Sequence, residues 1–180
     1  MGLLLIVVIL AVLCVMIYLS TYNNIKRCKM SVDQSRADIE IYMVKRYDVL
    51  KNSLEVVKEF TKHETETFKL AIEARKNMTI GEMQEIANNQ NQVAKGILAL
   101  GESYPELKSQ DVYTSLQRQL SDENAHYAAA KRAYNSNVNL YNQAIVTFPG
   151  NIIAPSMGAK LEEFLKDDEA EDKKNADIKF

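Results

Sequence analysis

The sequence predicts an all-α protein, in which an N-terminal transmembrane helix continues into a long antiparallel bundle of three to four helices. Three observations predict this class. Leu3 to Leu19 is an apolar run of 17 residues without a charge. Beyond it, apolar residues recur at spacings of three and four, the period of a helix face. All three prolines lie beyond residue 100, and no segment alternates in the manner of a strand. We divide the chain into an anchor (1–22), a helical bundle domain (23–165) and a charged, disordered tail (166–180).

The apolar run is predicted to be an uncleaved membrane anchor. Seventeen residues are the lower bound for a spanning helix, and the weakly polar flank through Tyr22 extends it to roughly 20. No Lys or Arg precedes the run and no small-residue cleavage site follows it, which argues against a secretory signal. We therefore expect a single-pass protein of the cell membrane that contacts the bilayer through residues 3–22. Because Lys26, Arg27 and Lys29 follow the run, the positive-inside rule places the N-terminus outside and the soluble domain in the cytoplasm.

The first soluble helix is expected to continue the anchor. No helix-breaking residue stands between Ile25 and Asn77, so the pattern predicts one uninterrupted helix up to Asn77. Its apolar face is formed by Ile39, Met43, Tyr47, Leu50, Leu54 and Val57, and is prolonged by Phe60, Phe68 and Ile72.

Two further long helices and one shorter helix are predicted. Thr79 caps the second helix, with Glu82 completing a capping box. Gln90 is the polar member of its apolar seam and is expected to fix register, while the surrounding tract of residues 88–92 mostly faces water. The third helix begins at Ser109 and ends before Pro149, with a wetter stretch between Leu120 and Tyr127 at Glu123 or Asn124. A shorter amphipathic piece, interrupted by Pro155 and Gly158, spans Ile152 to Leu165. Short loops between such helices favour antiparallel neighbours.

Composition argues against several function classes. The net charge of −2 gives no basic balance for nucleic acid. Both cysteines, Cys14 and Cys28, lie in or beside the anchor, so the soluble body has no disulfide framework and no cysteine metal cluster. Cys28 is interpreted as an ordinary juxtamembrane residue, with acylation as the alternative.

The histidines do not complete a metal or catalytic motif. His63-Glu64 would need a second histidine at position 67, which is Thr67. Glu123 and His126 match the Glu-x-x-His pattern of a carboxylate-bridged metal pair once, but Phe60 stands at the corresponding place before His63. We therefore assign no catalytic, cofactor-binding or metal-binding residue, and expect neither a cofactor nor enzymatic activity.

Two polar features are interpreted as structural contacts. The repeated pairs Tyr134-Asn135 and Tyr141-Asn142 lie on nearly the same side of one helix, where tyrosines usually make satisfied core contacts. A binding face is the alternative. Arg46 is expected to find a partner on another helix, because Asp48 does not face it along the same helix.

The sequence resembles the LemA family of bacterial membrane-anchored helical proteins from Tyr22 to about Ala154. The resemblance rests on ordered stretches: Lys45-Arg-Tyr-Asp-Val-Leu50, Lys62-His-Glu-Thr-Glu-Thr67, Glu73-Ala-Arg75, Glu102-Ser-Tyr-Pro-Glu-Leu-Lys108, Arg132-Ala-Tyr-Asn135, Tyr141-Asn142 and Phe148-Pro149. It implies a short outer N-terminus, one anchor and a mainly helical soluble domain, with no established enzymatic activity. Lys51 stands where the family usually has Pro, so a kink there should be weaker.

Our leading hypothesis is a membrane-anchored helical scaffold or adaptor for other membrane-associated proteins. Two alternatives from other classes stay open. One is a metal-dependent enzyme of the bundle core. The other is a homo-oligomeric, self-assembling membrane coat whose heptad seams form coiled-coil contacts between molecules.

Overall fold

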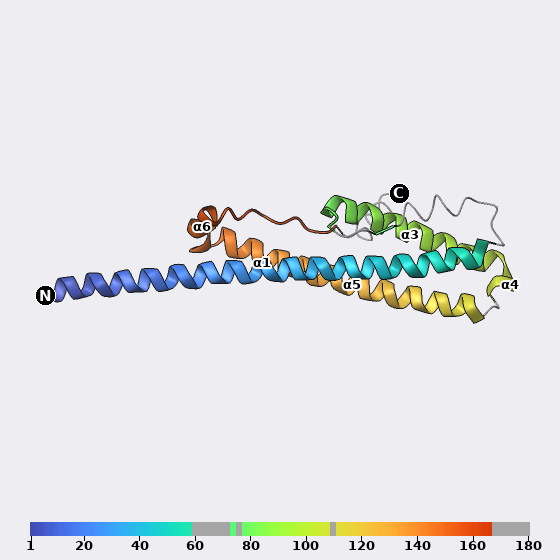
Figure 1. The fold of residues 1–180 in the computed structure, drawn as a ribbon, viewed down its shortest axis with the longest axis horizontal. Helices are drawn as coiled ribbons and strands as arrows, with labels where there is room; N and C mark the ends of the chain where they lie inside the picture. Colours follow the sequence, from blue (N-terminus) through green and yellow to red (C-terminus); the bar gives the residue numbers. More distant parts are fainter. Residues whose placement is uncertain (59–72, 75–76, 109–110, 167–180) are drawn as a thin grey trace, which may run out of the picture. The chain divides into compact units, whose positions relative to one another are not determined.

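The computed structural model describes residues 1–58, 73–74, 77–108 and 111–166 (Figure 1). Over these residues the secondary structure is helical and contains no strand, which confirms the all-α class. The helices are α1 (Gly2–Val57), α3 (Ile80–Ser103), α4 (Pro105–Lys108), α5 (Asp111–Val146), α6 (Gly150–Ile153) and the 3₁₀ helix η2 (Ala154–Met157). The chain divides into two compact units. Unit 1 comprises Met1–Arg36 and Ala133–Phe164, and unit 2 comprises Ala37–Arg132 and Leu165–Phe180.

Helix α1 is a single helix of 56 residues that contains the apolar run and continues far beyond it. Among the described residues it is the one helix long and apolar enough to cross a membrane by length and composition, and none of its apolar window is buried. The helix passes through Lys51 and ends at Val57, and Glu73 and Ala74 are not helical. The expected continuation to Asn77 was therefore wrong. Phe60, Phe68 and Ile72 lie outside the described residues.

Helix α3 begins as its capping motif predicts. The backbone N–H of Glu82 donates to Thr79 Oγ1 at 3.2 Å, and the backbone N–H of Thr79 donates to Glu82 Oε2 at 2.7 Å. Two backbone donors that the first turn would leave unpaired are thus satisfied. Just before the cap, Asn77 has a positive φ of 60°, a conformation that Asn tolerates better than most residues. The predicted cap of the third helix, Ser109, lies outside the described residues.

Unit 2 packs the C-terminal part of α1 against α3 and the N-terminal part of α5. Its core cluster is Val49, Leu50, Leu54, Val57, Val93, Ala94, Ile97, Leu107, Tyr113 and Leu120. Helix α5 runs antiparallel to the other two, whereas α1 and α3 run in the same direction (Figure 1). Because 22 residues separate α1 from α3 in the sequence, these two helices need not pair as a short-loop hairpin.

Unit 1 packs the first half of α1 against the second half of α5, α6, η2 and residues 158–164. The buried apolar side chains include Ile25 and Val32 from α1, and Tyr134, Val138, Tyr141 and Ile145 from α5. The predicted interruptions of the piece from Ile152 to Leu165 are found: the α-helix ends before Pro155, and the 3₁₀ helix η2 ends at Gly158. Pro155 has no backbone N–H to donate, and Gly158 adopts a left-handed φ of 62° that closes η2. Residues 159–166 then follow without helix.

Helices α3 and α5 approach each other closely at Gly101 and Tyr113. Gly101 is buried, and a Cβ atom there would overlap the ring and hydroxyl of Tyr113. The Tyr113 hydroxyl donates to the carbonyl of Ile97 at 2.9 Å and accepts from Gln117 Nε2 at 3.1 Å. A larger residue at position 101 would therefore displace a ring that is held by two hydrogen bonds.

We expect Gly101→Ala to lower the free energy of unfolding by about 1–3 kcal/mol, the usual cost of overpacking a core. Gly96→Ala on the same helix is the matched control, because a Cβ there meets nothing within 4 Å. It should raise the free energy of unfolding by about 0.5–1 kcal/mol, since Ala favours helix over Gly. Urea unfolding followed by circular dichroism measures both. Equal effects of the two substitutions would contradict the packing.

Candidate functional site

A buried arginine is the most unusual polar residue of unit 2. Arg46 on α1 is only 2% exposed. Its Nη2 donates to Asn91 Oδ1 on α3 at 2.5 Å, and its guanidinium carbon lies 5.6 Å from the ring centroid of Tyr127 on α5. The side chain thus contacts a residue on each of the other two helices. This confirms that Arg46 finds its partner across the bundle and not along its own helix.

Gln90 forms a second polar contact in the same region. Its side chain is fully buried, and Nε2 donates to the backbone carbonyl of Met43 on α1 at 3.1 Å. Because a buried donor is costly when it is unpaired, this bond favours one axial position of α3 against α1. The predicted role of Gln90 in register is consistent with this contact.

The tract around Gln90 faces inward more than expected. Asn88, Asn89 and Asn91 are half-buried, and only Gln92 is exposed. The expectation that residues 88–92 mostly face water was therefore wrong. Residues 90 and 91 lie next to each other at the edge of the seam, so both reach α1. Glu123 and Asn124 on α5 are half-buried, as expected for the wetter stretch of that helix.

The electrostatics of Arg46 are those of a desolvated charge. Burial lowers the pKa of Arg46, and the electrostatic interaction with the Tyr127 side chain acts in the opposite direction. Within the described parts of the chain, no carboxylate forms an ion pair with this guanidinium. Its positive charge is instead held by an amide oxygen and an aromatic face, which are weaker partners than a carboxylate.

The histidines and carboxylates that were considered as metal ligands, and not assigned, do not form a cluster among the described residues. The ring of His126 stacks on Tyr42, with centroids 5.5 Å apart. Glu123 has one buried carboxylate oxygen without a hydrogen-bond partner in the described structure. No group of three or more His, Cys, Asp or Glu side chains with metal-site geometry occurs in the described ranges. His63 and Glu64 lie outside them.

In unit 1, residues 158–164 form a strap that lies along α5. One amide side chain fastens it: Asn142 Nδ2 donates to the carbonyl of Glu162 at 3.0 Å, and Asn142 Oδ1 accepts from the Glu162 backbone N–H at 2.9 Å. The Tyr134 hydroxyl donates to the carbonyl of Glu163 at 2.9 Å. The interpretation of these repeated Tyr and Asn residues as structural contacts is thus confirmed for Tyr134 and Asn142.

An ion pair joins the strap to α1. Lys29 Nζ lies 2.5 Å from Glu162 Oε1 and 2.9 Å from Asp33 Oδ1, and 5.9 Å from the ring centroid of Tyr141. Burial acts to lower the pKa of Lys29, but the two carboxylates outweigh it and the net effect raises the pKa. The ion pair between Lys29 and Glu162 was not predicted from the sequence. Its members are far apart along the chain, and Lys29 was interpreted only as a charge flanking the anchor.

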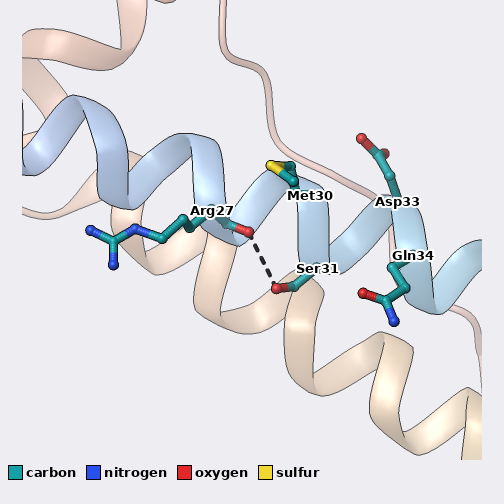
Figure 2. Close-up of a pocket in the computed structure, with 5 residues that line it drawn as sticks. All are labelled: Arg27, Met30, Ser31, Asp33 and Gln34. Atoms are coloured by element: carbon teal, nitrogen blue, oxygen red, sulfur yellow. Dashed lines mark hydrogen bonds between the residues drawn. The ribbon is translucent and has the colours of Figure 1, made fainter.

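Two surface pockets accompany these contacts in unit 1. One lies beside the strap and is lined by Ile25, Lys26, Lys29, Tyr141, Glu162 and residues 157–160. Figure 2 shows the other, whose lining residues Arg27, Met30, Ser31, Asp33 and Gln34 all belong to α1. The Ser31 hydroxyl donates to the Arg27 carbonyl at 3.2 Å, so it satisfies its own helix (Figure 2). Because one helix alone supplies the lining, this pocket offers no converging set of groups for a ligand.

Comparison with known proteins decides the family. A model of the LemA family matches residues 35–180. The chain belongs to the LemA family. A search of curated proteins found no match to the chain. The matched region of this LemA protein contains Arg46, Tyr134 and Asn142, which make the contacts described above. Family membership together with the apolar beginning of α1 fits a membrane-anchored helical protein.

A double-mutant cycle tests the Arg46 contact. We expect Asn91→Leu alone to lower the free energy of unfolding by about 2 kcal/mol, because it removes the acceptor and leaves a buried charge without it. In an Arg46→Met background the same substitution should cost much less, since the charge is gone. Chemical unfolding of the four proteins gives the coupling energy. An identical cost of Asn91→Leu in both backgrounds would contradict the contact.

Proposed function

We propose that this LemA protein is a non-enzymatic, single-pass scaffold that holds its helical domain at the cell membrane for other membrane-associated proteins. The observation that carries the proposal is the continuity of α1. The helix that contains the apolar window also supplies Ile25 and Val32 to the core of unit 1, and Leu50 and Val57 to the core of unit 2. The domain is thus built on the anchor itself instead of being joined to it by a linker.

The polar groups inside the domain support a structural role over a catalytic one. Arg46, Gln90, Tyr134 and Asn142 hydrogen-bond to groups of neighbouring elements, and those contacts hold the helices and the strap together. The surfaces left for partners are the outer helix faces, which include exposed apolar side chains such as Leu98 on α3.

Photo-crosslinking in cells tests the scaffold role. Leu98→benzoylphenylalanine in the full chain should give discrete adducts with other membrane-associated proteins, and these should disappear when residues 1–20, which are all exposed, are deleted. The deletion protein carrying the same substitution is the matched control. The absence of adducts would argue against the proposal. Adducts of only twice the mass of the protein would favour the self-assembling coat instead.

We further propose that the N-terminus lies outside and the domain in the cytoplasm, as the basic residues after the anchor suggest. In a Cys14→Ser, Cys28→Ser background, Lys95→Cys places one cysteine at an exposed position of α3. A membrane-impermeant maleimide should label it only after lysis. Gly2→Cys in the same background is the control and should react in intact cells. The reverse pattern would invert the topology.

A further inference from the structure

The turn between α5 and α6 exposes large apolar side chains at one end of unit 1. Val146 is 56% exposed, Phe148 78% and Ile152 68%. We name residues 146–152 the α5–α6 corner. Three large apolar side chains exposed within seven residues of the chain are unfavourable in water at a site that makes no use of them. We therefore expect the exposed side chains of the corner to be covered by an apolar environment outside unit 1.

The position of the corner along α1 identifies that surface. Helix α5 runs antiparallel to the first half of α1: Asn137 Nδ2 donates to the Ser31 carbonyl at 3.2 Å, and Lys29 lies over the ring of Tyr141. Continuing along both helices brings the end of α5 level with Ile25 and the residues before it. There the chain turns through α6 and η2, and the strap runs back along α5 (Figure 1). The corner therefore lies at the end of α5 that is closest to the apolar window of α1.

The exposure pattern of α1 agrees with this placement. Residues 1–20 are all exposed, whereas Thr21 and Tyr22 are half-buried and Ile25 is buried. Packing within unit 1 therefore starts directly where the apolar run ends. Ile25 lies about 9 Å beyond Leu19 at the rise of an α-helix. Residues 3–19 rise about 24 Å, so a hydrocarbon core about 30 Å thick extends about 3 Å beyond Leu19, and a headgroup layer about 5–7 Å thick follows it. Residues 21–25 of α1, and the corner level with them, lie at the depth of this layer when residues 3–19 span the membrane.

The chemistry of the corner suits the same layer. From Ala133 to Ala159 the chain has no Asp, Glu, Lys, Arg or His, so no side-chain charge would have to leave water. Exposed Lys26 and Arg27 on the neighbouring stretch of α1 can reach lipid phosphates. Tyr18 and Tyr22 stack on each other at the same level, as in an interfacial aromatic belt.

We infer that the α5–α6 corner inserts Val146, Phe148 and Ile152 into the interfacial layer of the bilayer beside the anchor. The domain then has a second membrane contact, so it is held against the lipid surface and not only tethered to it. This inference rests on α1 spanning the membrane, which is part of the proposed function.

Tryptophan fluorescence tests the contact, because the native chain contains no tryptophan. Phe148→Trp in the full chain is reconstituted into phosphatidylcholine vesicles with and without lipids brominated at the headgroup end of the acyl chain. Its emission should be blue-shifted and strongly quenched by the brominated lipid. Ile152→Trp is a second variant with the same expectation. Both positions are exposed, so neither substitution should disturb the core.

Leu140→Trp is the matched control. Leu140 is 54% exposed on the same helix, about 9 Å farther from the apolar window than Val146. Its emission should respond mainly to the aqueous quencher acrylamide. If the corner variants behave as Leu140→Trp does, the corner is in water and the inference is overturned. If neither quencher reaches them, the corner faces another polypeptide, which also overturns it.

Vesicle flotation tests whether α1 anchors the protein in the membrane, independently of whether the corner contacts lipid. The protein should float with the vesicles and resist alkaline extraction in every variant, since α1 is unchanged. Loss of flotation would refute the anchor on which the proposed function depends. Flotation with water-exposed tryptophan would refute only the corner contact.

Discussion

Burying one stripe of α1 is the constraint on which both units depend. From Ile25 to Val57 the helix places an apolar or small residue on the same side at nearly every turn, and the other elements cover that side. In unit 1 the cover is α5 together with the strap. In unit 2 it is α3 and α5. Because a single helix cannot bury its own stripe, each covering element gains stability chiefly through α1.

Polar side chains then determine the axial register of these helices against one another. An apolar stripe alone tolerates axial shifts of a helical turn, because leucine and isoleucine pack acceptably in several registers. A buried amide or guanidinium does not, since a shift leaves it without a partner. Gln90 and Arg46 act in this way in unit 2, and Asn142 does so for the strap in unit 1.

The same elements fit a protein whose role depends on position at a membrane. The anchor is the beginning of the main core helix, so the first covered turn of the domain lies directly after the apolar run. A corner with exposed Val146, Phe148 and Ile152 at this level has a physical use only beside lipid or another polypeptide. The proposed scaffold role and the proposed lipid contact both follow from building a domain on a helix that is long and apolar enough to span a membrane.

Spacing along the chain was enough to predict the helical class, the continuity of α1 through Lys51, the capping box at Thr79 and the apolar face of α1 from Ile39 to Val57. These depend on spacing and on contacts between near neighbours, which a single chain displays directly. Tertiary structure decided the end of α1 at Val57, the shared direction of α1 and α3, the inward placement of the Asn-rich tract and the nonhelical strap. It also decided the pairs Lys29–Glu162 and Arg46–Asn91. Each of these depends on which distant residues meet, and periodicity along one helix contains no information about its partner.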